Sequence, residues 1–264
     1  MNYLNSEQIK EACPSAFTQG QSTHLSKVYN HIPTTTVIDI LEEHNWKPVQ
    51  ALQGRSRRDS THLRPFKKHI LRFRNPEFDS LSEQINDTFP EVIVTNSHDG
   101  KSSFRFHIGL FRLVCSNGMV IADKSFGKYT ILHKGLKSFD IVDTIGDITR
   151  NIPHVVGRVQ DMMSHQLELS QRKQFGMDAV EKRWGDGREV DIDQLLSINR
   201  NADSSNDLWT VYNRVQEKLI GGGLNTSIKH GDKVIHNKTR KVNSIDENIR
   251  INKMLWELAE SYLN

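Results

Sequence analysis

Histidine and aspartate side chains gather in one stretch of the chain, where they could bind a divalent metal or transfer protons. The set is His98, Asp99, His107, Asp123 and His133. Imidazole and carboxylate groups are common metal ligands and common general acids and bases. Each residue also has a simpler role, because Asp99 opens an Asp-Gly turn, Asp123 ends a strand-like run, and histidines that alternate along a strand can face solvent. A metal-dependent nuclease is therefore only the third of the functions that we consider. We expect the protein to hold no metal and no cofactor.

The cysteines and the motif content favour a protein without catalytic chemistry. Cys13 and Cys115 are the only cysteines, which is too few for a disulfide framework or a zinc site built from several thiolates. Cys115 follows an apolar run, where cysteine is usually a small buried side chain rather than a nucleophile. The chain has no phosphate-binding loop, dinucleotide fingerprint, metalloprotease motif or serine nucleophile elbow. We expect a protein of a reducing compartment that is not an enzyme.

Positive charge is concentrated in two segments, although the formal net charge is only +3. Residues 47–74 hold nine Lys or Arg residues against one acid, and residues 229–241 hold five against one. Such patches attract a polyanion, whereas the alternative is an ordinary solvated surface. The candidate nucleic-acid-binding residues are Arg55, Arg57, Arg58, Lys68, Arg72, Arg74, Lys229, Lys233, Lys238, Arg240 and Lys241.

The segment FKKHILRFR at 66–74 alternates as a strand does, with Lys68, Arg72 and Arg74 on one face and Leu71 and Phe73 on the other. A strand repeats a face every ~6.6 Å, twice its rise per residue, which suits contact with successive phosphates. We therefore expect the basic face to be exposed, with RSRR at 55–58 in a loop that wraps a nucleic-acid backbone. Trp46, Phe66 and Phe73 could stack on bases, although aromatic side chains more often belong to a core.

These residues need a scaffold, and the pattern predicts an α+β fold: an N-terminal antiparallel β-meander with a short helix, followed by a mostly helical C-terminal half. Residues 1–33 show no sustained period and are expected to be a loosely packed arm. Residues 34–136 should form the sheet region and residues 137–264 the helical region, together as one continuous domain. No stretch has the pattern of a signal peptide or of a membrane span, so we expect a cytoplasmic protein.

Turn and capping signals place the elements. Asp99-Gly100 and Asn117-Gly118 should join the strands of the meander at 91–97, 101–116, 119–123 and 126–133. Helices are expected at 34–44, 170–184, 191–198, 207–220 and from the capping box at Ser244, with a long helix over 141–163 that Pro153 should kink or split. Residues 229–241 should form an exposed, mobile loop or hairpin.

The segments TNSHDGKSSFRF, FRLVCSNGMV, NDLWTVYNRVQEKLIGGG and VNSIDENIRINKMLWELAE resemble the phage- and plasmid-related proteins called domain of unknown function 932. The resemblance spans roughly residues 35–262. It implies residence on mobile elements of a bacterial host, and it implies no catalytic residues.

The order of elements is also similar to that of the single-strand annealing recombinases, which form rings and bind DNA along a basic groove. On this basis we expect an oligomeric protein that binds single-stranded DNA, or anneals it, during recombination or replication. The alternative hypothesis is a phage-encoded protein-interaction module, such as an inhibitor of a host defence system. The expected partners are therefore nucleic acid, further copies of the chain, or a host or phage protein, and not a membrane.

Overall fold

The computed structural model describes residues 2–18, 33–54, 66–98, 104–112, 118–120, 130–131, 138–230 and 233–263. The chain divides into two compact units. The first comprises Met1–Glu83, Thr88–Phe111 and Lys124–Pro153, and the second comprises Gln84–Asp87, Arg112–Asp123 and His154–Asn264. The boundary expected near residue 137 falls within the first unit, and the expectation of one continuous domain stays a prediction. Among the described residues, no helix combines the length and the apolar character needed to cross a membrane.

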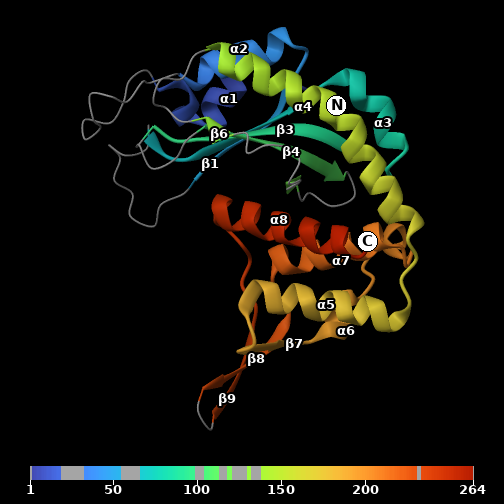
Figure 1. The fold of residues 1–264 in the computed structure, drawn as a ribbon. Helices are drawn as coiled ribbons and strands as arrows, with labels where there is room; N and C mark the ends of the chain where they lie inside the picture. The colour runs from blue at the N-terminus through green and yellow to red at the C-terminus, as the bar shows by residue number, and fades with distance from the viewer. Residues whose placement is uncertain are drawn as a thin grey trace. The chain divides into compact units, whose positions relative to one another are not determined.

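The predicted β-meander is confirmed (Figure 1). Its strands lie in chain order: β1 (Lys47–Gln53), β2 (His69–Arg74), β3 (Thr88–Asn96), β4 (Phe104–Arg112) and β5 (Gly118–Val120), while β6 (Thr130–Ile131) pairs with β4. β2 is antiparallel to both β1 and β3. The turn residues Asp99, Gly100 and Asn117 lie outside the described residues.

Helices α2 (Thr34–Glu43) and α4 (Ser138–Ser164) lie on one side of β1 to β4 (Figure 1). Apolar residues at a spacing of three and four give α4 its buried face, with Ile141, Ile145, Ile148 and Ile152 all at 0% exposure. Trp46, also fully buried, donates a hydrogen bond from Nε1 to Thr149 Oγ1 at 3.3 Å. Pro153 lies inside α4 without splitting it, so the helix continues to Ser164.

The described part of the N-terminal segment, residues 2–18, is helical and packed, contrary to the expectation of a loosely packed arm; residues 19–32 lie outside the described residues. Residues 6–12 form α1 (Ser6–Ala12) and residues 14–17 form the 3-10 turn η1 (Pro14–Phe17). Asn5 and Gln8 make a capping box at the start of α1, and Ile9 and Ala16 are buried. Periodicity missed this helix because a seven-residue helix contributes only one apolar residue, Ile9, to the core.

The second unit is largely helical, as predicted. It contains α5 (Leu169–Trp184), α6 (Ile192–Leu196), α7 (Leu208–Gly221) and α8 (Ile245–Ser261). Ser244 caps α8 by accepting a hydrogen bond from the Glu247 backbone N–H, which confirms the capping signal in the sequence. Three buried aromatic rings join α7 to α8. Trp209 stacks on Tyr212 at 5.5 Å, and Trp256 lies edge-on to both rings.

The expectation that the C-terminal half is almost wholly helical missed a small antiparallel sheet. Its strands are β7 (Arg188–Val190), β8 (Asn225–His230) and β9 (Lys233–Lys238), in the order β7-β8-β9. The other short elements that the structure describes are the 3-10 turn η3 (Pro76–Phe78), the helix α3 (Asp79–Glu83) that follows it, and the 3-10 turn η4 (Asn201–Asp203). The strands of this sheet were hidden in the sequence because they are three to six residues long and mostly polar.

A buried chain of hydrogen bonds fastens the N-terminal segment and α2 to the strands of the first unit. The Thr34 Oγ1 atom lies 3.0 Å from His69 Nε2 and 3.2 Å from His98 Nε2, and it accepts a hydrogen bond from Asn96 Nδ2 at 3.1 Å. On its other side, His69 Nδ1 lies 3.0 Å from Ser15 Oγ and 3.2 Å from the Lys67 carbonyl oxygen. His69 is fully buried.

The partners determine which ring nitrogens carry hydrogen. A carbonyl oxygen only accepts, so Nδ1 of a neutral His69 is the donor and its Nε2 accepts from the Thr34 hydroxyl. The Thr34 oxygen then receives hydrogen bonds from Asn96 and His98, which fill its two lone pairs. A proton added to His69 Nε2 would face the Thr34 oxygen, which has no lone pair left to accept it. Burial lowers the pKa of His69 to about 4, and this full set of donors opposes protonation in the same direction.

This arrangement predicts a loss of stability in mild acid. His69 titrates near 6.5 in the unfolded chain and near 4 in the folded one. Its contribution is therefore fully present above pH 6.5 and is lost as pH falls towards 4, by about 3 kcal/mol in total. Urea unfolding between pH 7 and pH 4.5 measures the slope. His69→Gln should reduce the slope, and a slope equal to that of the unmodified protein would contradict this account.

Candidate nucleic-acid interface

The predicted basic face of β2 is buried, so the expectation that Arg72 and Arg74 are exposed is wrong. The two side chains are 7% and 3% exposed, and both form ion pairs with the buried Glu91 of the neighbouring strand β3. Arg72 Nε lies 2.5 Å from Glu91 Oε2, and Arg74 Nη2 lies 2.7 Å from Glu91 Oε1. Arg72 also donates to Gln50 Oε1 at 2.8 Å. These guanidinium groups are part of the packing of the sheet.

Strand register and aromatic rings explain why the two arginines can be buried. Arg74 pairs directly with Glu91 across β2 and β3, and Arg72 is two residues along on the same face. The Arg72 guanidinium lies 3.9 Å from the ring centroid of Phe111, and that of Arg74 lies 3.8 Å from the ring centroid of Phe89. Cation–π contacts and a shared carboxylate therefore replace the water that each guanidinium loses. Alternation in the sequence revealed the face but not what covers it.

Of the other candidates in the first basic segment, the structure describes only Lys68. Arg55, Arg57 and Arg58 lie outside the described residues, and Lys68 is half-buried. Trp46 and Phe73, considered as stacking residues, are fully buried in the core. Of the possible metal ligands, His98 and His107 are buried, while Asp99, Asp123 and His133 are outside the described residues, as is Cys115. No group of three His, Cys, Asp or Glu side chains suited to a metal occurs in the described part of the chain.

The second basic segment forms an exposed hairpin, which is one of the two forms, loop or hairpin, that the sequence predicted for it. Its strands β8 and β9, hereafter the β8–β9 hairpin, pair from Asn225↔Lys238 to His230↔Lys233. Each strand is six residues, or about 20 Å, long. All six residues of β9 are exposed. The candidate cations Lys229, Lys233, Lys238, Arg240 and Lys241 are all exposed, and the hairpin extends beyond α5 and α6 (Figure 1).

A close backbone approach holds the base of the hairpin. Gly222 ends α7 with φ +74°, and a Cβ there would lie 2.6 Å from the backbone of Arg240 and Lys241, so only glycine fits without displacing the returning chain. The buried Thr239 then bonds to Leu224 in both directions, through its backbone N–H at 2.8 Å and through its side-chain oxygen at 3.0 Å. The base is therefore fixed, while β9 beyond it is exposed to solvent.

The two faces of the three-stranded sheet differ in charge. Cross-strand partners share a face, so Arg188, Ile228 and Ile235 form one row, with Lys233 beside them. On the opposite face, Glu189, Ser227 and His236 form the matching row, with Lys229 and Lys238 beside it. The Lys229 Nζ lies 3.4 Å from the Glu189 carboxylate, so an acid offsets the lysines of that face.

The row of Glu189, Ser227 and His236 does not form a nucleophile. The Ser227 hydroxyl donates to Glu189 Oε2 at 3.0 Å, whereas a serine nucleophile must donate to a base that takes its proton. Hydrogen bonds from Ser227 and Lys229 lower the pKa of Glu189, which weakens it further as a base. A shallow hollow of about 430 Å³ lies on this sheet, lined by residues that include Glu189, Asn225 and His236. Its polar lining suits hydrogen bonding rather than covalent catalysis.

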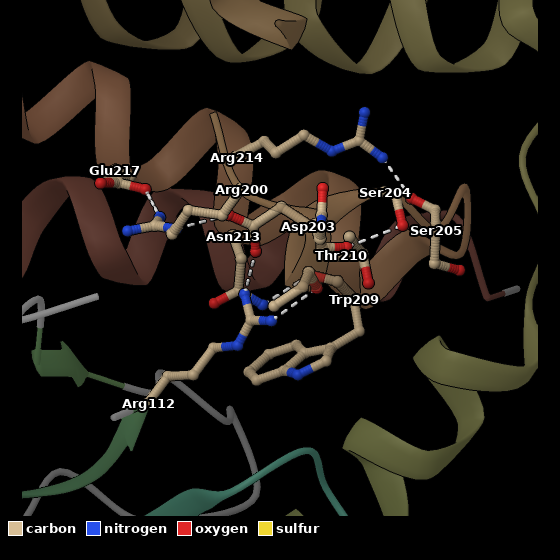
Figure 2. Close-up of polar contacts among 12 residues, drawn as sticks. Arg112, Arg200, Asp203, Ser204, Ser205, Trp209, Thr210, Asn213, Arg214 and Glu217 are labelled. Carbon is tan, nitrogen blue, oxygen red and sulfur yellow. Dashed lines mark hydrogen bonds and ion pairs between the residues drawn. The ribbon is translucent and has the colours of Figure 1, made fainter. Parts of the chain in front are cut away.

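A second charged cluster, which the sequence did not reveal, stabilises the loop between α6 and α7 (Figure 2). Asp203 accepts from two arginines, Arg112 at 2.5 Å and Arg200 at 2.9 Å, and Arg200 also pairs with Glu217. Arg214 donates to the carbonyl oxygens of Ser205 and Leu196. Burial alone would raise the pKa of Asp203, but the hydrogen bonds from the two arginines bring it below its usual value. Arg112 and Asp203 are 91 residues apart, so no local pattern could link them.

Lys218 extends this cluster. Its Nζ donates to the Ser197 carbonyl oxygen and lies 2.6 Å from the Ser197 hydroxyl. Burial lowers the pKa of Lys218 to about 8, and the nearby Arg214 and Arg200 add to the effect. A lysine with this pKa can act as a nucleophile, but here it is held by the loop that it supports. The cluster therefore stabilises the loop, and the β8–β9 hairpin is the better candidate for an interface.

Comparison with known proteins places the chain in a family. The family model described as Domain of unknown function (DUF932) matches residues 22–256. The chain belongs to this family. This DUF932 chain is 36% identical to UPF0380 protein YafZ and 35% identical to UPF0380 protein YfjQ, both of Escherichia coli strain K12, over 98% of its own length and 92% of theirs. No solved structure matches it. The resemblance expected from the sequence is thus confirmed, and the family carries no assigned function.

The buried ion pairs of the DUF932 sheet predict a large effect of one substitution. Glu91→Gln should lower the free energy of unfolding by about 3–5 kcal/mol, because it leaves two buried guanidinium groups without their carboxylate. Urea unfolding followed by circular dichroism measures the change. The matched control is Asp147→Asn, which breaks an exposed pair with Arg150 and should cost at most about 1 kcal/mol. Similar losses for both variants would show that burial of the Glu91 pairs adds nothing.

Proposed function

We propose that this protein binds nucleic acid through the β8–β9 hairpin, without cleaving it. The observation that carries the proposal is a two-stranded ribbon about 20 Å long, exposed along β9 and followed by two more cations, Arg240 and Lys241. Lysine and arginine side chains at this density bind phosphates and release the counterions that surround them. Loops and hairpins that project from a fixed base are common places for such binding.

We assign to the hairpin the nucleic-acid binding that the sequence led us to expect of β2. Arg72 and Arg74 are committed to Glu91, so they are excluded from the proposed interface. Helix α7 is no candidate for a DNA-reading helix, because 11 of its 14 residues are buried. The role in recombination or replication of a mobile element, by single-strand binding or annealing in an oligomer, extends this proposal and rests on the resemblances described above.

A protein-interaction module is the second candidate, and the outer strand of the hairpin favours it. β9 ends the three-stranded sheet and exposes Val234 and Ile235, at 50% and 44%. An extended segment of another protein could add to such an edge. The lysines at both ends of β9 oppose this, since charged residues on an edge strand discourage strand addition. We therefore place nucleic-acid binding first.

Binding should depend steeply on salt and on the hairpin lysines. The double substitution Lys233→Ala with Lys238→Ala should reduce the slope of log affinity on log salt by about 1.4, since each phosphate contact on a single strand contributes about 0.7. Titration of a labelled 30-nucleotide single strand and a 30-base-pair duplex, at salt concentrations from 50 to 300 mM, measures the slope.

The matched control removes two other lysines, with Lys10→Ala and Lys173→Ala. Lys10 lies in α1, and Lys173 lies in α5, where it pairs with Asp193 of α6. This variant therefore loses the same formal charge away from the hairpin. Its slope should equal that of the unmodified protein. A chain that binds neither nucleic acid at 50 mM salt would reject the proposal and favour the protein-interaction module.

A further inference from the structure

Trp184 differs from the other three tryptophans of the chain. Trp46, Trp209 and Trp256 are 0%, 1% and 1% exposed and belong to the two cores. Trp184 is half-buried at the last residue of α5, directly before the turn into β7. An aromatic ring of this size that is partly in contact with water is available to a ligand with a flat apolar face.

Two guanidinium groups accompany the ring. The centre of the Arg183 guanidinium lies 4.0 Å from the Trp184 ring centroid, and that of Arg188 lies 5.3 Å from it. Arg183 is held in place by its hydrogen bond to the Leu219 carbonyl oxygen. Burial lowers the pKa of Arg183 to about 10, and Arg250 and Arg188 lower it further although Glu247 opposes them. Positive charge is therefore dense around Trp184.

Strand register connects Trp184 to the hairpin. Arg188 of β7 pairs with Ile228, which pairs with Ile235, and Lys233 is two residues from Ile235, so all four lie on one face of the sheet. This face carries no acidic residue on its strands, unlike the opposite face with Glu189. We call this row the Trp184 strip; its members are Arg183, Trp184, Arg188, Ile228, Lys233 and Ile235.

We propose that the Trp184 strip binds single-stranded nucleic acid, with a base stacked at Trp184 and the backbone phosphates at Arg188 and Lys233. The inference rests on the proposed function and names its substrate class. Unpaired bases expose their flat faces to aromatic rings and guanidinium planes, whereas the bases of a duplex are stacked on one another. Phosphates need cations beside that ring, and the strip supplies them. The same chemistry fits DNA and RNA, so the test includes both.

Tryptophan fluorescence tests the stacking on the unmodified protein. A 30-nucleotide oligothymidylate should quench the emission, because a base on Trp184 contacts the one tryptophan that lies outside the cores. A 30-base-pair duplex should leave the emission unchanged at saturation. Oligouridylate serves as the RNA arm, and equal quenching would assign the site to single strands of both kinds. Binding of oligothymidylate without quenching would overturn the proposal and leave the proposed function intact.

Affinity measurements give an independent test. Trp184→Ala should weaken oligothymidylate binding by about 5- to 150-fold without changing the salt slope, because it removes stacking and no charge. Trp184→Phe should restore most of the affinity, and Tyr3→Ala, an exposed aromatic residue of the first unit, should have no effect. Equal weakening of single-strand and duplex binding by Trp184→Ala would overturn the proposal that the strip binds single strands. Loss of all binding at 50 mM salt in the unmodified protein would instead reject the proposed function.

Discussion

One buried carboxylate organises the sheet of the first unit. Glu91 neutralises Arg72 and Arg74 at once, and each arginine is 7% exposed or less. Two cations in such a place are tolerable only because the carboxylate, Gln50 and the rings of Phe89 and Phe111 surround them. The basic face of β2 is therefore part of the packed structure. This constraint decides which of its positive charges remain for a partner.

The candidate cations that the structure describes as exposed lie on the second unit, and their setting is different. The β8–β9 hairpin has a fixed base at Gly222 and Thr239, and beyond it the lysines are hydrated rather than paired with buried acids. A hydrated lysine exchanges counterions for phosphates at little cost, whereas a buried arginine would first have to leave its carboxylate. From charge and alternation in the sequence, the basic strand at 66–74 was the better candidate. The structure distinguishes the two segments by the exposure of their side chains, because Arg72 and Arg74 are buried and the hairpin lysines are exposed.

Regular elements with strong patterns were predicted well. The helix of residues 34–43, the strands of the meander and the capped helices of the second unit all follow from periodicity, turn residues and caps. The failures have a common cause. The N-terminal segment with α1 is held by the burial of Ile9, Cys13 and Ala16, and β7 is held by its pairing with β8. Such elements are specified by distant partners, and short segments have too few residues for a period to appear.

The sequence by itself determined the α+β class, the order of the long elements, the family and the position of the two basic segments. Only the tertiary structure decided that Arg72 and Arg74 are buried while the hairpin lysines are exposed, because burial of the two arginines depends on Glu91, which is 17 residues from Arg74 along the chain, and on the more distant Phe111. It also decided that Trp184, rather than Trp46, meets solvent. Both outcomes depend on contacts between strands and helices that no local pattern records, since a charge or an aromatic ring has the same letter in a core and on a surface.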